Sequence, residues 1–427
     1  MIAADTIAAP ATAPGPAAVG MVRISGPQAF AVAGRVCRRW PAVVDARRAV
    51  RTAFQRDGAV FDEGIALPFV GPASYTGEDL VELHGHGGHA LRVLLDAVLA
   101  AGARIADPGE FSQRAYLNGK LDLAQAEAVA QLITAQTDRA LRVARAALGG
   151  SVSREVEALE RALGALRGRV EGILDFEAES AGAEVGLDIE VRALSAWARR
   201  LADGYRSGRR LFARSEVVLA GPVNAGKSSL FNALCGEDRA LVDASPGTTR
   251  DLVTADWELD GMPLRLCDSA GWRDAVGVEA RGIEKGRDAA QVAALVLWVC
   301  PAGSMEPPPD AGWLRVAAKV DLAPKVRLDP GVVPVSVVAG TGLSALRAAI
   351  SARLMPGADE EIQGVTERQA MAFGQASEAL ERASGTPELE LAAEELALAS
   401  RALATVRGEG IGPEVIDEVF RQFCIGK

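Results

Sequence analysis

Hydrophobic positions in the middle of the chain recur with the period of an α-helix. Leu121, Ala124, Ala128 and Leu132 lie three or four residues apart, and the same spacing continues at Val156, Leu159 and Leu163. No proline occurs between residues 120 and 214, and proline is the residue that most strongly interrupts a helix. Residues 120–213 are therefore predicted to be helical.

The same composition returns near the carboxyl end of the chain. From Val365 onward alanine, leucine and glutamate predominate, and residues 390–397 form an amphipathic helical pattern. The segment between the two helical stretches has a different pattern, and Pro356-Gly357 marks the point where the helical composition resumes. We therefore predict one helical domain made of two chain segments, with another domain inserted between them.

The inserted segment contains short apolar runs that are typical of buried strands. These runs are residues 217–220, 264–267, 314–317 and 332–335. These strands, together with the helical segments between them, predict an α/β domain.

A phosphate-binding loop follows the first of these strands. Residues 221–228 read G-P-V-N-A-G-K-S, and a helix-like segment begins directly after them. In such a loop the backbone N–H groups surround the phosphates, the lysine carries charge to their oxygens, and the serine hydroxyl holds Mg²⁺. The predicted nucleotide contacts here are Asn224, Ala225, Gly226, Lys227, Ser228 and Ser229, with Ser228 as a Mg²⁺ ligand.

Two further segments have the order expected of a nucleotide triphosphatase. The polar loop at residues 247–251 offers Thr249 as a second Mg²⁺ ligand. The strand-like run 264–267 leads into Asp268, which is predicted to reach the Mg²⁺ shell, and Gly271, whose N–H can bind the γ-phosphate.

The base-reading segment departs from the usual GTPase pattern. GTPases of this type usually read Asn-Lys-x-Asp, whereas this chain has Ala318-Lys319-Val320-Asp321. Asp321 can accept hydrogen bonds from guanine, and the Lys319 stem can lie over the base. Ser336 opens the predicted last base-contacting loop. We expect guanine preference with reduced affinity, because one lost polar contact is worth roughly 1 to 3 kcal/mol.

The residue that positions the attacking water is not evident from the motifs. Ras-like proteins place a glutamine directly after Asp-x-x-Gly, and this chain has Trp272 there. Glu279 is a candidate for that role. The alternative is that Glu279 is a solvated carboxylate in the first turn of a helix.

Taken together, these motifs resemble the tRNA modification GTPases called MnmE or TrmE. The resemblance extends beyond the nucleotide segments to both ends of the chain. It rests on residues 5–9 and 22–26, on the runs S-Y-T-G-E-D and E-L-H-G-H-G-G at 74–79 and 82–88, on residues 108–111 and 118–128, and on the terminal F-C-I-G-K at 423–427.

The resemblance implies a potassium-activated GTPase. It implies that Glu279 orients the water, although the preceding loop is one residue shorter than usual. It implies a K⁺ site in which Asn224 is one ligand, and it implies that two subunits pair their G domains. The remaining K⁺ and nucleotide contacts implied are Asp243, Ser245, Gly247 and Thr248. A K⁺ ion there would play the part of an arginine finger.

The resemblance also implies a folate site in the N-terminal domain. The ligand would be a tetrahydrofolate derivative, in its 5,10-methylene or 5-formyl form, that donates one carbon. The positions carried over are Arg23, Glu82, Lys120 and Lys427. In the family the terminal tail enters this site and its cysteine is needed, which assigns a catalytic role to Cys424. The cluster His84, His86 and His89 is interpreted as a polar loop, with a metal site as the less favoured alternative.

Composition limits the cellular context. The five cysteines have no metal-binding spacing and are typical of a reducing compartment. The net charge of −10 argues against a generic nucleic-acid binder. No run of apolar residues is long enough to cross a membrane, and we expect a soluble cytoplasmic protein.

We therefore predict a multidomain α/β plus α protein. The predicted domains are an N-terminal α+β folate-binding and dimerisation domain at 1–119, the first half of a helical domain at 120–213, a Ras-like G domain at 214–355, and the second helical half at 356–427. The implied partners are a second copy of the chain, an FAD-dependent MnmG-type protein in a heterotetramer, and tRNA. The alternatives are a ribosome-assembly GTPase, or a folate-dependent transferase with a degenerate regulatory nucleotide domain.

Overall fold

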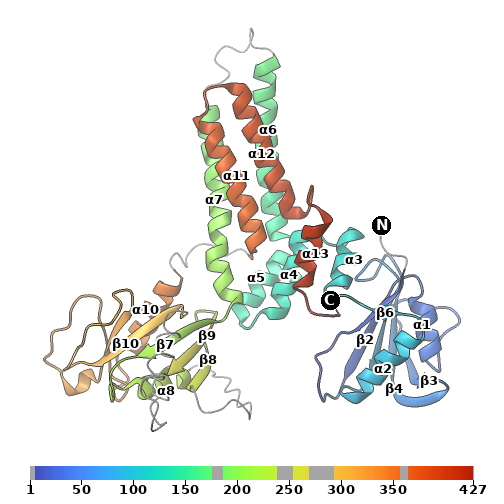
Figure 1. The fold of residues 1–427 in the computed structure, drawn as a ribbon, viewed down its shortest axis with the longest axis horizontal. Coiled ribbons are helices and arrows are strands. Elements are labelled where there is room, and N and C mark those ends of the chain that lie inside the picture. Colours follow the sequence, from blue (N-terminus) through green and yellow to red (C-terminus); the bar gives the residue numbers. More distant parts are fainter. Residues whose placement is uncertain (1–4, 176–185, 238–252, 269–292, 356–363, 427) are drawn as a thin grey trace. The chain divides into compact units, whose positions relative to one another are not determined.

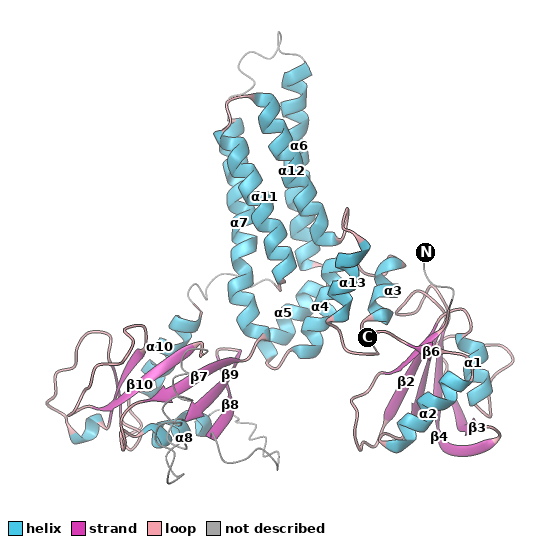
Figure 2. Ribbon diagram, in the orientation of Figure 1, coloured by secondary structure: helices cyan, strands magenta, loops and turns pink. Residues whose placement is uncertain are grey.

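The computed structural model describes residues 5–175, 186–237, 253–268, 293–355 and 364–426 (Figure 1). Contacts within the chain divide it into two compact units. The first comprises Met1–Ala130, Ser153–Leu194 and Glu378–Lys427, and the second comprises Gln131–Val152 and Ser195–Ser377. Helices and strands together confirm the predicted mixture of α/β and helical architecture (Figure 2).

The first unit contains a six-stranded sheet formed by the N-terminal residues. Its strands are β1 (Ile7–Pro10), β2 (Gly20–Ser25), β3 (Val50–Arg56), β4 (Ala59–Phe69), β5 (Leu80–Gly85) and β6 (Arg104–Ile105). Their order is β3-β4-β5-β2-β1-β6. All neighbours are antiparallel except β1 and β6, which are parallel.

The two faces of this sheet have different partners. Helices α1 (Ala29–Val36) and α2 (His89–Ala100) pack on one face and share a core with inward residues such as Val22 and Leu83. Because side chains alternate along a strand, the neighbouring residues Arg23 and Glu82 lie on the opposite face. On that face Phe111, from helix α3 (Glu110–Leu117), packs with residues of β1.

Helices complete the first unit. They include most of α4 (Leu123–Thr134), most of α6 (Ser151–Asp175), α12 (Leu389–Arg407) and α13 (Pro413–Arg421). The apolar positions predicted from helical spacing, Val156, Leu159 and Leu163, are fully buried in α6. Arg407 of α12 pairs with Glu160 of α6 at 2.9 Å, which joins two segments far apart in the sequence.

The second unit contains the predicted inserted sheet. Its strands are β7 (Ser215–Ala220), β8 (Val253–Leu259), β9 (Met262–Asp268), β10 (Leu295–Pro301), β11 (Leu314–Ala318) and β12 (Val333–Val335). Their order is β12-β11-β10-β7-β9-β8, and only the β8–β9 pair is antiparallel. A parallel sheet whose first strand leads to a phosphate-binding loop is the expected scaffold for a nucleotide site.

Helices surround this sheet or extend from it. They are α8 (Lys227–Glu237), α10 (Leu343–Leu354), the 3₁₀ turn η2 (Val320–Leu322) and α5 (Asp138–Leu148). Parts of α7 (Leu187–Phe212) and α11 (Glu367–Gly385) also belong to this unit. Ser195 of α7 and Ser377 of α11 are buried and joined by hydrogen bonds through their hydroxyls. Among the described residues, no helix is both long and apolar enough to span a lipid bilayer.

A buried arginine organises the region around α3. The Arg114 side chain is only 3% exposed, and its guanidinium binds Asp5, Glu78 and Glu110 at 2.8 to 3.1 Å. The guanidinium of Arg104 also binds Glu110 and Asp5. Burial alone would raise the pKa of Glu110, but hydrogen bonds from Arg104, the Asp107 amide and Arg114 outweigh it and hold that pKa below its ordinary 4.5.

We predict that Glu110→Gln lowers the free energy of unfolding at pH 7 by roughly 2 to 4 kcal/mol, because it leaves a buried guanidinium partly uncompensated. The control is Glu63→Gln, which breaks the exposed Arg51–Glu63 pair and should cost less than about 1 kcal/mol. Denaturant titration followed by circular dichroism measures both. An equal loss of unfolding free energy in the two variants would contradict the role of Glu110 in neutralising the buried Arg114.

The same cluster predicts an acid dependence. A carboxyl whose folded-state pKa is lowered contributes stability above its unfolded pKa, and this stability is lost as pH falls through the folded value. Wild-type stability should therefore decline below about pH 4.5, the ordinary pKa of Glu110, and the decline should be shallower in Glu110→Gln. Titrations repeated between pH 7 and pH 3 test this.

Candidate functional site

The phosphate-binding loop joins β7 to α8 and has the backbone geometry that its sequence predicts. Gly221 has φ +144°, and a Cβ there would lie 2.0 Å from the Val299 carbonyl oxygen. Gly226 has φ +100°, and Asn224 has φ +59°. Asparagine adopts the left-handed conformation more readily than most residues, so position 224 suits both this backbone and a side-chain oxygen ligand.

The Lys227 side chain is held inside this loop by hydrogen bonds to the loop backbone. Lys227 is the first residue of α8 and is buried, and its ammonium donates to the carbonyls of Gly221 and Pro222 at 2.9 and 2.8 Å. The charge therefore lies against the carbonyls at the beginning of the loop, and Lys227 begins a helix whose N-terminus favours anions. Ser228 and Ser229 follow it in α8 and are exposed.

The predicted base loop contacts the phosphate loop. Lys319, in the left-handed conformation at φ +58°, donates from Nζ to the Asn224 carbonyl at 2.7 Å. Ser336 donates to Asp321 Oδ1 and also accepts the Ala339 amide. The two predicted base-contacting segments are thus joined, and Asp321 is oriented by a buried hydroxyl.

Ala318 points toward the phosphate loop. A Cβ built on Gly226 would lie 3.7 Å from the Ala318 Cβ and 3.6 Å from the Lys319 Cε. An asparagine at 318 would therefore direct its amide at the loop. In this chain the Lys319 ammonium joins the base loop to the phosphate loop.

Asp268 is at the end of β9 and is 3% exposed. Strand β9 pairs in parallel with β7, so Asp268 lies level with Leu219, close to the start of the phosphate loop. The role predicted for Asp268 near Mg²⁺ stays a prediction. The other residues predicted for nucleotide, cations or catalysis lie outside the described residues, and they are Asp243, Ser245, Gly247, Thr248, Thr249, Gly271 and Glu279.

The predicted folate residues Arg23 and Glu82 are a direct cross-strand pair. They are opposite each other in β2 and β5, and Arg23 donates to Glu82 Oε1 at 2.8 Å. The Arg23 guanidinium also lies 5.5 Å from the Tyr75 ring centre and 5.8 Å from that of Phe111. Cation–π contact with two rings fixes the plane of this guanidinium.

His84 is a member of this site that the motifs did not identify. Its Nε2 lies 3.5 Å from Glu82 Oε2. The interaction with His84, and then the hydrogen bond from Arg23, outweigh the effect of burial and lower the pKa of Glu82. The strand alternation that places residues 82 and 84 on one face could have indicated it.

The carboxyl-terminal tail reaches the same pair. Arg23 donates to the Gly426 carbonyl at 3.4 Å, across 403 residues of sequence. Gly426 has φ +95°, and a Cβ there would lie 2.1 Å from the Pro10 carbonyl oxygen. Phe423 is buried and packs on Phe420 with ring centres 5.3 Å apart. Cys424, between these two anchor points, is exposed.

The remaining predicted folate residues are less closely connected. Lys120 donates to the Pro72 carbonyl at 3.0 Å, and no hydrogen bond found among the described residues joins it to Arg23 or Glu82. Lys427 lies outside the described residues.

The other two histidines are part of the polar surface. His86 pairs with Asp62 at 2.7 Å, and His89 begins α2. Within the described residues, no group of three or more His, Cys, Asp or Glu side chains is arranged to hold a metal ion. The cysteines are unpaired, and burial raises the pKa of Cys37 to about 12.

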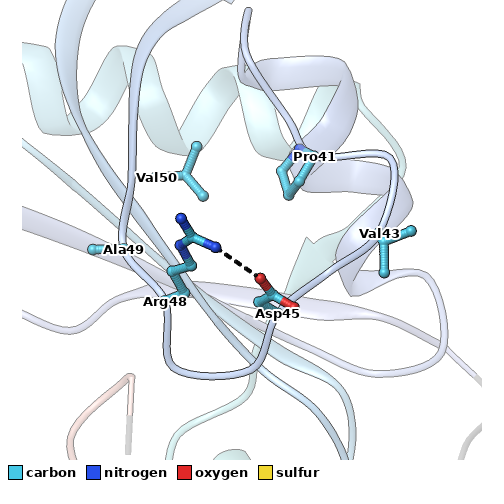
Figure 3. Close-up of a pocket in the computed structure, with 6 residues that line it drawn as sticks. All are labelled: Pro41, Val43, Asp45, Arg48, Ala49 and Val50. Atoms are coloured by element: carbon cyan, nitrogen blue, oxygen red, sulfur yellow. Dashed lines mark hydrogen bonds and ion pairs between the residues drawn. The ribbon is translucent and has the colours of Figure 1, made fainter.

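One hollow lies apart from the nucleotide loops and from the residues around Arg23 and Glu82. It measures about 300 Å³ and is formed by the loop before β3, where Arg48 pairs with Asp45 (Figure 3). The loop leads to β3, the edge strand of the sheet, whereas Arg23 and Glu82 lie on inner strands. Both charged side chains are highly exposed, so the hollow offers no enclosed polar site.

Known proteins resemble this chain over its whole length. The model of the GTP-binding protein TrmE N-terminus matches residues 6–120, and the model of the MnmE helical domain matches residues 123–424. A relative from Myxococcus xanthus, named tRNA modification GTPase MnmE, is 43% identical over 99% of both chains. A relative of the same name from Thermus thermophilus is 44% identical, again over 99% of both.

Among solved structures, the G domain of the T. maritima FeoB iron transporter is 27% identical over 33% of this chain and 99% of that chain, with a TM-score of 0.27. The full-length relatives and the two family models carry the assignment, and they agree with the motifs at residues 74–88, 221–228 and 423–427. The chain belongs to the MnmE family of tRNA modification GTPases.

Proposed function

We propose that this protein is a K⁺-dependent GTPase that modifies tRNA. As a homodimer, and together with an FAD-containing MnmG-type partner, it adds an aminomethyl or carboxymethylaminomethyl group to the wobble uridine. A tetrahydrofolate derivative supplies the carbon. The protein acts in the cytoplasm.

The observation that carries this proposal is the meeting of Arg23, Glu82 and the Gly426 carbonyl. GTP hydrolysis alone does not require the amino-terminal sheet to meet the carboxyl-terminal tail. The donor set suits a reduced pterin, because an ionised carboxylate accepts from its amino and N–H edge while a guanidinium donates to its carbonyl. The lowered pKa keeps Glu82 ionised at neutral pH.

The GTPase part of the proposed function rests on the phosphate loop. Lys227 would redirect its ammonium from the Gly221 and Pro222 carbonyls to the β/γ oxygens of GTP. Ser228 and Thr249 would hold Mg²⁺, and Asp268 would reach its shell. The Asn224 side chain is exposed at the loop where a K⁺ ligand is proposed. When bound, these cations neutralise charge on the phosphates.

The acidic composition favours a partner-assisted RNA site. A net charge of −10 gives little general attraction for phosphates, so tRNA binding by this chain would depend on local arginines and on the partner's surface. This separates the proposal from a ribosome-assembly GTPase, for which we would expect a basic RNA-binding domain after the G domain.

The test of the GTPase half is GTP hydrolysis by purified protein in K⁺ against Na⁺ buffer at equal ionic strength. We expect at least about tenfold faster turnover in K⁺, because the ion takes the part of an arginine finger. Glu279→Ala should lower kcat roughly 100-fold, because it removes the group that positions the water. ATP serves as the control nucleotide.

Equal turnover in both salts would remove the potassium site from the proposal. Tetrahydrofolate binding without any GTP turnover would instead favour the folate-dependent transferase with a regulatory nucleotide domain.

Ala318→Asn should tighten GDP binding. The added amide would face the phosphate loop near Gly226 and add one polar contact, worth about 1 to 3 kcal/mol or roughly 5- to 150-fold in Kd. Calorimetric titration measures this, with Ala302→Asn as a control at another buried alanine beside the same strand. Unchanged or weaker binding in Ala318→Asn would show that the Lys319 contact already satisfies the loop.

Cys424→Ser should abolish tRNA modification while leaving GTP turnover within about twofold, because Cys424 lies on the tail and not in the nucleotide loop. Ile425→Ala, at the adjacent exposed position, is the matched control and should retain modification. Nucleoside analysis of tRNA and phosphate release measure the two activities. Loss of GTP turnover in Cys424→Ser would contradict the assignment of Cys424 to the modification reaction alone.

A further inference from the structure

Helix α5 is hydrogen-bonded to the turn between β8 and β9. Asp260 and Gly261 form this two-residue turn with φ +50° and +81°, the left-handed geometry typical of Asp-Gly hairpins. The Thr137 hydroxyl donates to the Gly261 carbonyl at 2.7 Å, and Arg139 donates to the Asp260 carbonyl at 2.9 Å. Both carbonyls of the turn are therefore bound by residues at the start of α5.

The fit between the turn and the helix is close. A Cβ added to Gly261 would lie 2.4 Å from the Arg139 Cβ, so the backbone of the turn approaches the helix as nearly as glycine allows. Thr137 is also the N-cap of α5 and accepts the Ala140 amide at 3.1 Å. Its hydroxyl thus donates to the hairpin and accepts from the helix at the same time.

A second set of contacts joins the same parts. Arg214, which precedes β7, binds Asp256 of β8 at 2.9 Å and Gln136 at 2.8 Å. Beneath these polar groups, Ala140 of α5 belongs to the same buried cluster as Leu259 and Met262 of the hairpin. Displacing the hairpin relative to α5 would break polar and apolar contacts together.

The hairpin lies between the nucleotide segments in the sequence. Strand β8 begins at Val253, soon after the predicted Mg²⁺ ligand Thr249, and β9 ends at Asp268, shortly before Gly271. Val253 and Asp268 are paired, so they form one end of the hairpin. Any nucleotide-dependent movement of the two segments would act on this end. The far end of the hairpin, its turn, is the part bound to α5.

We propose that Thr137 and Arg139 are positioning residues that transmit the nucleotide state from the β8–β9 hairpin to helix α5. The inference rests on the proposed function for the roles of Thr249 and Gly271. The physical element is a hairpin joined at one end to the nucleotide segments and at the other to a helix outside the G-domain sequence. Neither residue belongs to any of the nucleotide motifs.

The test is hydrogen exchange of the full-length protein with GDP and with a non-hydrolysable GTP analogue in K⁺ buffer. In wild type, changing the nucleotide should alter exchange in residues 253–268 and in residues 141–148 of α5. In Thr137→Val the hairpin response should remain, while the α5 response should shrink about fivefold, the effect of one hydrogen bond. Thr137→Ser keeps the hydroxyl and should restore the wild-type response.

Two further variants complete the design. Arg139→Ala removes the second hydrogen bond without touching the helix cap, so it tests the coupling even if Thr137→Val folds poorly. Arg142→Ala alters an exposed arginine one turn further along the same helix and should behave as wild type.

An α5 response that is absent in wild type, or unchanged in both Thr137→Val and Arg139→Ala, would overturn the inference. GTP hydrolysis and tRNA modification are measured on the same preparations. Absence of modification in wild type, with a normal α5 response, would count against the proposed function and leave the coupling intact.

Discussion

The buried guanidinium of Arg114 is the constraint on which the amino-terminal site depends. A charge this deeply buried must be neutralised, and its three carboxylates come from Asp5 before β1, Glu78 before β5, and Glu110 in α3. Satisfying one charge therefore fixes three segments that lie far apart in the sequence. Glu78 also accepts the Ser25 hydroxyl from the end of β2, which ties the strand that carries Arg23 into the same network.

The consequence for the site is a rigid support for a polar pair. Arg23 lies opposite Glu82 and contacts the rings of Tyr75 and Phe111, which come from the loop and the helix that Arg114 holds in place. Phe111 belongs to α3, and Tyr75 is linked to the same helix because its hydroxyl shares a hydrogen bond with Ser112. A ligand that bound Arg23 or Glu82 in place of its present partner would contact side chains whose positions are already fixed. Less conformational entropy would then be lost on binding.

The sequence predicted the local elements well because their causes are local. The helical spacing of Val156, Leu159 and Leu163, the phosphate loop, and the fold class are confirmed by the described structure and the family models. Contacts between distant segments carry no local pattern. The Arg23–Gly426 hydrogen bond could not be read from spacing, and neither could the binding of Thr137 to Gly261. His84 differs, because strand alternation places it on the same face as Glu82. The assignments of Glu279, potassium and folate remain predictions.

The base loop and the phosphate loop are joined although the base loop departs from the usual motif. That motif has an asparagine where this chain has Ala318. Here Lys319 adopts a left-handed backbone and reaches the Asn224 carbonyl, while Ser336 orients Asp321 from the other side. Because Asn224 is itself left-handed, its carbonyl faces Lys319 only while the loop keeps that conformation. The order of the base loop therefore depends on the order of the phosphate loop, so a change at Asn224 should affect the predicted guanine recognition as well as the proposed K⁺ contact.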